Sequence, residues 1–225
     1  MGKFQLHVIT EPKRDFDELR RSVDAAMRAG ADWVQLRDKG ASAQAMYRQA
    51  LELRHPHGRL SINDRVDVAL ACGAAGAHLA AQSLPVAEAK RIAAGRLLVG
   101  RSVHALDEAI QAARDGADYL TFGHVFPSSS KPGQEPRGVA QLAEIVEAVG
   151  VPVVAIGGIN AANLDQVLAT GCAGIAVISA VLSAPDPGLA TAELRRALDA
   201  SPHQPRRSFE SLEGTHAPDA QPTAV

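Results

Sequence analysis

Apolar runs of strand length alternate with amphipathic segments of helix length along almost the whole chain, and this alternation restricts the possible folds more than any other feature. Candidate strands cover residues 5–10, 33–37, 60–63, 76–80, 97–103, 119–125, 151–157 and 174–179. Candidate helices cover residues 16–29, 43–54, 65–72, 86–93, 106–114, 139–149, 161–169 and 189–198. Several helices close on small residues and glycine just before the next strand, as in AGADWV and DGADYL, which is typical of an αβ turn. The pattern therefore indicates parallel βα units.

Two architectures are built from such units, namely a closed (β/α)8 barrel and an open doubly wound sheet. Eight units in a chain of 225 residues, without a GxGxxG motif after the first strand, favour the barrel. We therefore expect an α/β fold with a single domain, a (β/α)8 TIM barrel, over residues 1–199. Residues 200–225 are rich in proline, serine and charge, and this composition predicts a disordered C-terminal tail.

Charge and cysteine content exclude several classes of partner and site. Lysine plus arginine number 23 against 25 aspartate plus glutamate, with no block of like charge, so we expect no nucleic acid and no membrane as partner. Cys72 and Cys172 stand alone, which is typical of buried apolar residues rather than of a disulfide or a zinc site. No apolar run reaches membrane-spanning length. We expect a cytoplasmic protein, and a homodimer by analogy with other barrels of this size.

The carboxyl ends of the strands are the informative positions, because a (β/α)8 barrel builds its site there. The second strand ends with Gln35, Arg37 and Lys39, which alternation sends to one side. Three hydrogen-bond donors at one strand end could hold a phosphate or a carboxylate. The alternative is a surface ion pair of these cations with Asp38 and Glu11.

The third and fourth strands end in groups whose role the local sequence leaves open. Asn63 and Asp64 end the third strand, and Asp64 could cap the following helix or bind a metal or ammonium ion. His78 lies inside the fourth strand, where a hydrogen-bonded core histidine is the expected reading rather than a catalytic residue.

A single histidine stands where the sixth strand should end. His124 follows Gly123 and precedes a polar loop, Ser128 to Lys131, and a titratable group beside a Ser/Lys/Gly loop suits a site that handles a proton and an anion. The fifth strand contributes Ser102 and His104. For His104, a partly exposed position near a helix start is an equally good explanation.

The loops after the seventh and eighth strands predict a phosphate site. Gly157 and Gly158 offer backbone N–H groups with no side chain in the way, and Ile178 and Ser179 end the eighth strand. Barrels often hold phosphate at these two loops through backbone donors and a helix N-terminus.

Together these residues resemble the superfamily of thiamine phosphate synthase and the thiazole tautomerase TenI. The matching segments are QLRDK (35–39), INDRVDVAL (62–70), SVH (102–104), FGHVFPSSSKPG (122–133), VVAIGGI (153–159) and AVIS (176–179). They come in the family's order and cover nearly the whole chain to about residue 199. The resemblance implies a (β/α)8 barrel that binds phosphorylated small molecules.

The resemblance implies a different reaction for each branch. The synthase joins a pyrimidine pyrophosphate to thiazole phosphate with Mg²⁺, which two carboxylates would hold. Asp64 matches the first carboxylate, whereas Ser83 in HLAAQS stands where the synthase pattern has the second. The synthase usually reads GPVFPT where this chain reads GHVFPS, and a histidine at that place is similar to the tautomerase branch, where it serves as general acid/base.

These two departures predict a thiazole tautomerase that needs no cofactor and no metal. It would aromatise the thiazole phosphate carboxylate tautomer by a proton shift through His124. The resemblance assigns phosphate binding to Gly157, Gly158, Ile178 and Ser179, and substrate binding to Gln35, Arg37, Lys39, Asn63, Ser102 and Lys131. Two alternatives stay open, a Mg²⁺-dependent thiamine phosphate synthase with Asp64 as metal ligand and a non-catalytic regulator that binds thiazole or thiamine phosphate.

Overall fold

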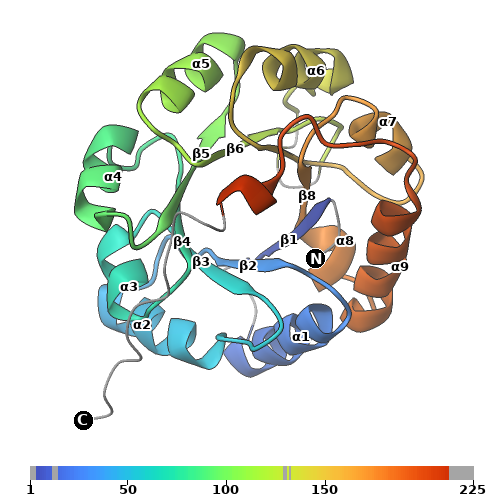
Figure 1. Ribbon diagram of the computed structural model, residues 1–225. Coiled ribbons are helices and arrows are strands. Elements are labelled where there is room, and N and C mark those ends of the chain that lie inside the picture. The colour runs from blue at the N-terminus through green and yellow to red at the C-terminus, as the bar shows by residue number, and fades with distance from the viewer. Residues whose placement is uncertain (1–3, 12–14, 129–130, 132, 213–225) are drawn as a thin grey trace.

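Eight parallel strands close into a barrel in their sequence order, and helices surround it (Figure 1). The computed structural model describes residues 4–11, 15–128, 131 and 133–212. The strands are β1 (Gln5–Ile9), β2 (Trp33–Leu36), β3 (Arg59–Asn63), β4 (Gly76–Leu79), β5 (Leu98–Val103), β6 (Tyr119–Gly123), β7 (Val153–Ile156) and β8 (Gly174–Val177). β1 pairs in parallel with β8, with Leu6 opposite Ile175, so the sheet has no free edge. The predicted (β/α)8 barrel is confirmed and the open sheet is excluded.

The helices follow the strands as the alternation predicts. They are α1 (Phe16–Arg28), α2 (Ala43–Glu52), α3 (Val66–Ala71), α4 (Val86–Ala93), α5 (Leu106–Arg114), α6 (Gly138–Ala148), α7 (Leu164–Leu168), α8 (Ser179–Leu182) and α9 (Pro187–Ala200). Asp15, Ser42 and Asp186 cap α1, α2 and α9 through their side-chain oxygens. The short α8 is an addition to the predicted pattern. Within the described residues, no helix has both the length and the apolar character that a membrane span requires.

Alternation along each strand divides the molecule into two layers. Leu6 and Val8 of β1 face outward and pack in the main apolar core against the helices. Ile9 faces inward and packs with Tyr119, Val154 and other residues inside the barrel. The inward residues at the carboxyl ends of the strands therefore face the site, whereas those at the amino ends form a packed floor.

The C-terminal segment closes the floor of the barrel instead of forming a disordered tail from residue 200. The short 3₁₀ helix η1 (Phe209–Leu212) lies across the barrel in Figure 1. Phe209 is 2% exposed, and its ring lies 5.3 Å from Tyr119, 5.5 Å from His7 and 6.4 Å from Trp33 between ring centroids. For residues 201–212 the predicted tail is wrong, because one aromatic side chain finds an apolar seat that average composition does not reveal. Residues 213–225, and Ser129 and Ser130 of the predicted loop, lie outside the described residues.

Phe209→Ala is expected to destabilise the protein by about 3 kcal/mol, because it removes a fully buried ring from a packed floor. Urea unfolding followed by circular dichroism measures this difference. Leu189→Ala is the control, because Leu189 is 56% exposed and its truncation should change stability by less than about 0.5 kcal/mol. Equal stability of the two variants would show that the segment does not seal the barrel.

Candidate functional site

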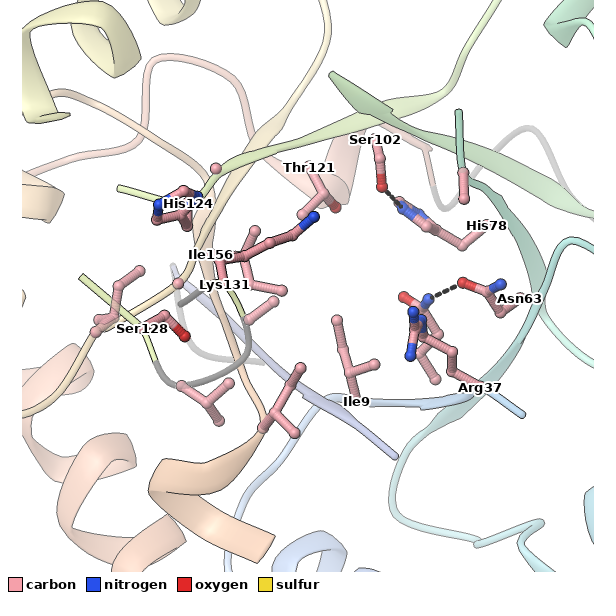
Figure 2. A pocket seen from close by; sticks show the side chains of 18 of the residues that line it. Ile9, Arg37, Asn63, His78, Ser102, Thr121, His124, Ser128, Lys131 and Ile156 are labelled. Carbon is pink, nitrogen blue, oxygen red and sulfur yellow. Dashed lines mark hydrogen bonds between the residues drawn. The ribbon is translucent and has the colours of Figure 1, made fainter. Parts of the chain in front are cut away.

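A cavity of about 660 Å³ opens at the carboxyl ends of the strands, on the side away from the Phe209 floor. Each of the eight strands contributes at least one residue to its wall. The side chains of Figure 2 converge on this space from different strands. The structure brings together all the residues predicted for catalysis, phosphate binding and substrate binding, namely Gln35, Arg37, Lys39, Asn63, Ser102, His124, Lys131, Gly157, Gly158, Ile178 and Ser179.

Two cations project from the end of β2 without the ion pairs that the alternative reading required. The Thr10 hydroxyl accepts a hydrogen bond from the backbone N–H of Arg37 at 2.8 Å, which fixes the chain at this point. Asp38 instead accepts from the backbone N–H groups of Gly40 and Ala41 and so closes its own turn. Among the described residues, neither Arg37 nor Lys39 forms an ion pair with Asp38 or Glu11. Their charge is available to an anion in the cavity.

A chain of side-chain hydrogen bonds links the cavity wall to Asp64. Gln35 Nε2 donates to Asn63 Oδ1 at 2.9 Å, and Asn63 Nδ2 donates to Asp64 Oδ2 at 2.6 Å. Figure 2 shows the first of these bonds at the edge of the cavity. Because Gln35 and Asn63 are both 4% exposed, each amide has one orientation that suits its partner.

Asp64 does not cap the following helix, contrary to one of the two readings of the sequence. Its φ is 64°, and the residue at the N-cap of α3 is Arg65. The Asp64 carboxylate instead accepts hydrogen bonds from the Ala80 backbone N–H and the Ser83 hydroxyl. An aspartate held in the left-handed region by several hydrogen bonds is typical of a functional position.

The donor set around Asp64 fits a magnesium ion only with help from a substrate. Ser83 lies beside Asp64, so the position where the synthase pattern has a second carboxylate carries a hydroxyl oxygen. No three His, Cys, Asp or Glu side chains cluster as a metal site in the described part of the chain. Mg²⁺ is commonly held by one or two carboxylates together with substrate phosphates and waters. Asp64 supplies one carboxylate, which is enough when substrate phosphates and waters complete the coordination.

The glycines after β7 allow an unusually close approach of two loops. Gly157 and Gly158 have φ values of 99° and 68°. A side chain on Gly157 would overlap His124, and one on Gly158 would overlap the backbone of Phe126 and Pro127. Because neither glycine has a side chain, the loop after β7 can pack directly against the loop after β6. Ile178 and Ser179, at the start of α8, line the same cavity.

His124 lies at the margin of the cavity, on the side away from Asn63 and His78 (Figure 2). It is 7% exposed, and its Nε2 lies 3.2 Å from the backbone oxygen of Gln134. The imidazole is thus in hydrogen-bond contact with the main chain of its own loop. His124 therefore has a structural contact in addition to its position in the cavity wall.

His78 lines the cavity, although the sequence predicts no role for it in the site. The structure bears out the reading of a hydrogen-bonded core histidine, because both ring nitrogens have partners. It also places His78 in the cavity wall, beside Ser102 (Figure 2). The sequence signal was its position, one residue before the end of β4 and facing inward with Gln35 and Asn63. His104 lines the cavity too, and its Nδ1 lies 3.4 Å from Glu108 on α5.

Two buried histidines make stability depend on pH. Burial lowers the pKa of His7 to about 3 and that of His78 to about 4. In the unfolded chain both imidazoles bind a proton below about pH 6.5, whereas in the folded protein they stay neutral until the pH falls to their lowered pKa values. Stability should therefore be constant above about pH 7 and fall as the pH drops from 6.5 toward 4, by about 4 kcal/mol in total at pH 5. Urea unfolding at pH 7 and pH 5 tests this, and His78→Gln should show about half the difference. A wild-type stability equal at both pH values would contradict it.

Comparison with known proteins now adds to this geometry. Residues 6–181 match the family model described as thiamine monophosphate synthase. A thiamine-phosphate synthase from Pyrococcus abyssi is 44% identical over 201 residues, which cover 88% of this chain and 96% of that protein. One from Gloeobacter violaceus is 45% identical over 192 residues, but the chain spans only 55% of its length. The solved structure of thiamine phosphate pyrophosphorylase from Pyrococcus furiosus superposes with a TM-score of 0.79 at 43% identity, covering 88% of this chain and 96% of that one.

The prediction of a thiazole tautomerase, an isomerase, is wrong. Relatives at 44% and 45% identity bear the name of a synthase, which is a transferase. The prediction depended on only two positions, His124 and Ser83. The contact with Gln134 gives His124 a use that the sequence did not suggest, because a histidine that hydrogen-bonds to the main chain of its own loop helps to hold that loop in place.

Proposed function

We propose that this chain, which belongs to the thiamine monophosphate synthase family, is itself a thiamine-phosphate synthase. The observation that supports this most strongly is the name shared by relatives that are 44% and 45% identical over most of the chain. The substrates would be hydroxymethylpyrimidine pyrophosphate and thiazole phosphate, and the products thiamine phosphate and pyrophosphate.

Two regions of the cavity suit two phosphorylated substrates. Arg37 and Lys39 carry positive charge at the end of β2, whereas the glycine loop after β7 and the start of α8 offer backbone groups on another side. The Lys131 side chain extends into the space between these regions in Figure 2. We assign the pyrophosphate to the cations and the single phosphate to Gly157, Gly158 and the α8 start, because charge-assisted contacts suit the more highly charged group.

The reaction would break one bond and form one bond at the same carbon. The C–O bond between the pyrimidine methylene and pyrophosphate breaks, and the oxygen keeps the electron pair. The thiazole ring nitrogen donates its lone pair to form the new C–N bond. Arg37, Lys39 and Lys131 would stabilise the negative charge that develops on the leaving pyrophosphate, and Gln35, Asn63 and Ser102 would orient the pyrimidine ring.

Asp64 would be the protein ligand of Mg²⁺, with Ser83 as a neighbouring hydroxyl oxygen. When bound, the ion would supply positive charge next to the pyrophosphate oxygens. The hydrogen bonds from Ala80 and Asn63 hold the Asp64 carboxylate in a fixed orientation for this purpose.

Release of pyrophosphate, measured with a coupled phosphate assay, tests the function. We expect release that requires both substrates and Mg²⁺ and stops in excess EDTA. Release from the pyrimidine substrate alone at the same rate would indicate hydrolysis instead of transfer. Tight binding of thiazole phosphate with no release under any condition would favour the regulator and overturn the proposed function.

A further inference from the structure

A side chain takes the place of the main chain at the end of the ladder between β1 and β2. Gln35 lies opposite Ile9, and the Thr10 N–H donates to the Gln35 carbonyl oxygen at 2.9–3.0 Å spacing typical of the ladder, here 3.0 Å. The evenly spaced bonds of a parallel pair would next join the Arg37 N–H to the Thr10 carbonyl oxygen. The Arg37 N–H instead donates to Thr10 Oγ1 at 2.8 Å, and this hydroxyl donates to the Arg37 carbonyl oxygen over a longer distance, 3.4 Å. Thr10 therefore continues the ladder through its hydroxyl beyond the end of β1.

The Thr10 hydroxyl is buried and lies outside the cavity wall. Thr10 is 1% exposed, so water hardly competes for its hydrogen bonds. Of the described residues, Ile9 and Glu11 line the cavity on either side of Thr10 in the chain, whereas Thr10 does not. Thr10 can therefore act on a bound ligand only through a neighbour, and Arg37 is the neighbour that its hydroxyl holds.

The register that Thr10 fixes decides where the Arg37 side chain lies. Alternate side chains of a strand share a face, so Arg37 faces the cavity with Gln35 only while the chain stays extended as far as residue 37. On the other side of Arg37, Asp38 Oδ1 accepts hydrogen bonds from two backbone N–H groups of its own turn, at 2.9 and 3.2 Å. The segment that carries Arg37 is thus held at both ends, and Figure 2 shows Arg37 in the cavity wall.

We propose that Thr10 is a positioning residue for a bound anion, because its hydroxyl holds the Arg37 backbone in the register that directs the guanidinium into the cavity. An arginine whose backbone is fixed before binding loses less conformational freedom when it binds a phosphate group. The identity of the anion as the pyrophosphate of the substrate rests on the proposed function, whereas the bond between Thr10 and Arg37 does not. The effect belongs to binding, so it should appear in affinity and KM rather than in kcat.

The bond can be tested without any ligand. Thr10→Val keeps the branched shape of the side chain and removes the hydroxyl, whereas Thr10→Ser keeps the hydroxyl. Amide hydrogen exchange followed by NMR should find the Arg37 N–H protected in the wild type and in Thr10→Ser, and exchanging at least 10-fold faster in Thr10→Val. Equal exchange of this N–H in the wild type and in Thr10→Val would overturn the inference, whatever reaction the protein catalyses.

Binding of inorganic pyrophosphate, measured by calorimetry at a fixed Mg²⁺ concentration, tests the consequence for the anion. Thr10→Val should weaken binding by about 10-fold, and Thr10→Ser should stay within about threefold of the wild type. Thr191→Val is the matched control, because Thr191 is 0% exposed and its hydroxyl donates to the Pro187 oxygen within α9 at 2.7 Å. It should leave the affinity unchanged. An equal loss in both Thr→Val variants would trace the effect to general destabilisation and would reject the positioning role.

A double-mutant cycle shows whether Thr10 acts through Arg37. The double variant Thr10→Val, Arg37→Gln should bind pyrophosphate no more weakly than Arg37→Gln alone, and losses that multiply would reject this route. In steady-state kinetics, Thr10→Val should raise KM for the pyrophosphate substrate by about 10-fold and leave kcat within about twofold. A wild type that binds no pyrophosphate would overturn the role of Thr10 toward this anion together with the placement of the anion in the proposed function. Tight wild-type binding that Thr10→Val leaves intact would overturn the inference alone.

Discussion

Asp64→Asn is expected to lower kcat by about 10³-fold at saturating Mg²⁺. The substitution keeps the size of the side chain but removes the one carboxylate that the β3 and β4 loops offer to the metal. Loss of several kcal/mol of charge stabilisation at the leaving group corresponds to this factor, since about 1.4 kcal/mol is tenfold in rate. Steady-state kinetics over a range of Mg²⁺ concentrations measure the change.

Metal binding provides a readout that does not depend on turnover. Electron paramagnetic resonance of Mn²⁺ should show binding to the wild type in the presence of inorganic pyrophosphate and much weaker binding to Asp64→Asn. Asp67→Asn is the matched control, because Asp67 lies on the neighbouring helix and pairs with Arg65. Turnover of Asp64→Asn within about threefold of the wild type would remove Asp64 from the metal site.

Arg37→Gln should reduce kcat/KM for the pyrophosphate substrate by about 10²-fold, mainly through KM. Arg37 brings a charge to the cavity wall and has no ion pair with Asp38 or Glu11 among the described residues, so it can contribute its full charge to a ligand. Arg37→Lys should restore part of the loss, because lysine keeps the charge but not the planar pair of donors.

Two comparisons separate this effect from a general change of charge. Arg28→Gln on α1 removes a cation that pairs with Asp24, far from the cavity wall, and should leave kcat/KM unchanged. Inhibition by inorganic pyrophosphate should weaken in Arg37→Gln to the same extent as KM rises. An unchanged inhibition constant would place the pyrophosphate elsewhere in the cavity.

The barrel, and the residues that line the cavity at the carboxyl ends of its strands, can be predicted from local sequence patterns. Strand-length apolar runs that alternate with helix-length segments specify parallel βα units, and closure brings the carboxyl ends of all strands together. Residues as distant in sequence as Gln35 and Ser179 are therefore predicted to line one cavity, and both of them do. The fold alone was sufficient for this prediction, because a (β/α)8 barrel places its site at the carboxyl ends of all its strands.

Features that depend on individual tertiary contacts could not be predicted from the sequence. Phe209 lies in a segment of disordered composition, and only the aromatic floor of the barrel explains its burial. Asp64 has the sequence context of a helix cap, but Ala80 and Ser83, far along the chain, decide its conformation. The contact of His124 with the backbone of Gln134 was likewise absent from the sequence prediction, because a comparison of motifs does not show it.

Detection of the joined product tests the central claim most directly. Purified protein is incubated with hydroxymethylpyrimidine pyrophosphate, thiazole phosphate and Mg²⁺, and thiamine phosphate is quantified by mass spectrometry, with Asp64→Asn as the matched sample. We predict many equivalents of thiamine phosphate per wild-type molecule and almost none from the variant. Absence of thiamine phosphate from a folded wild-type protein supplied with both substrates and the metal would contradict the assignment as a synthase.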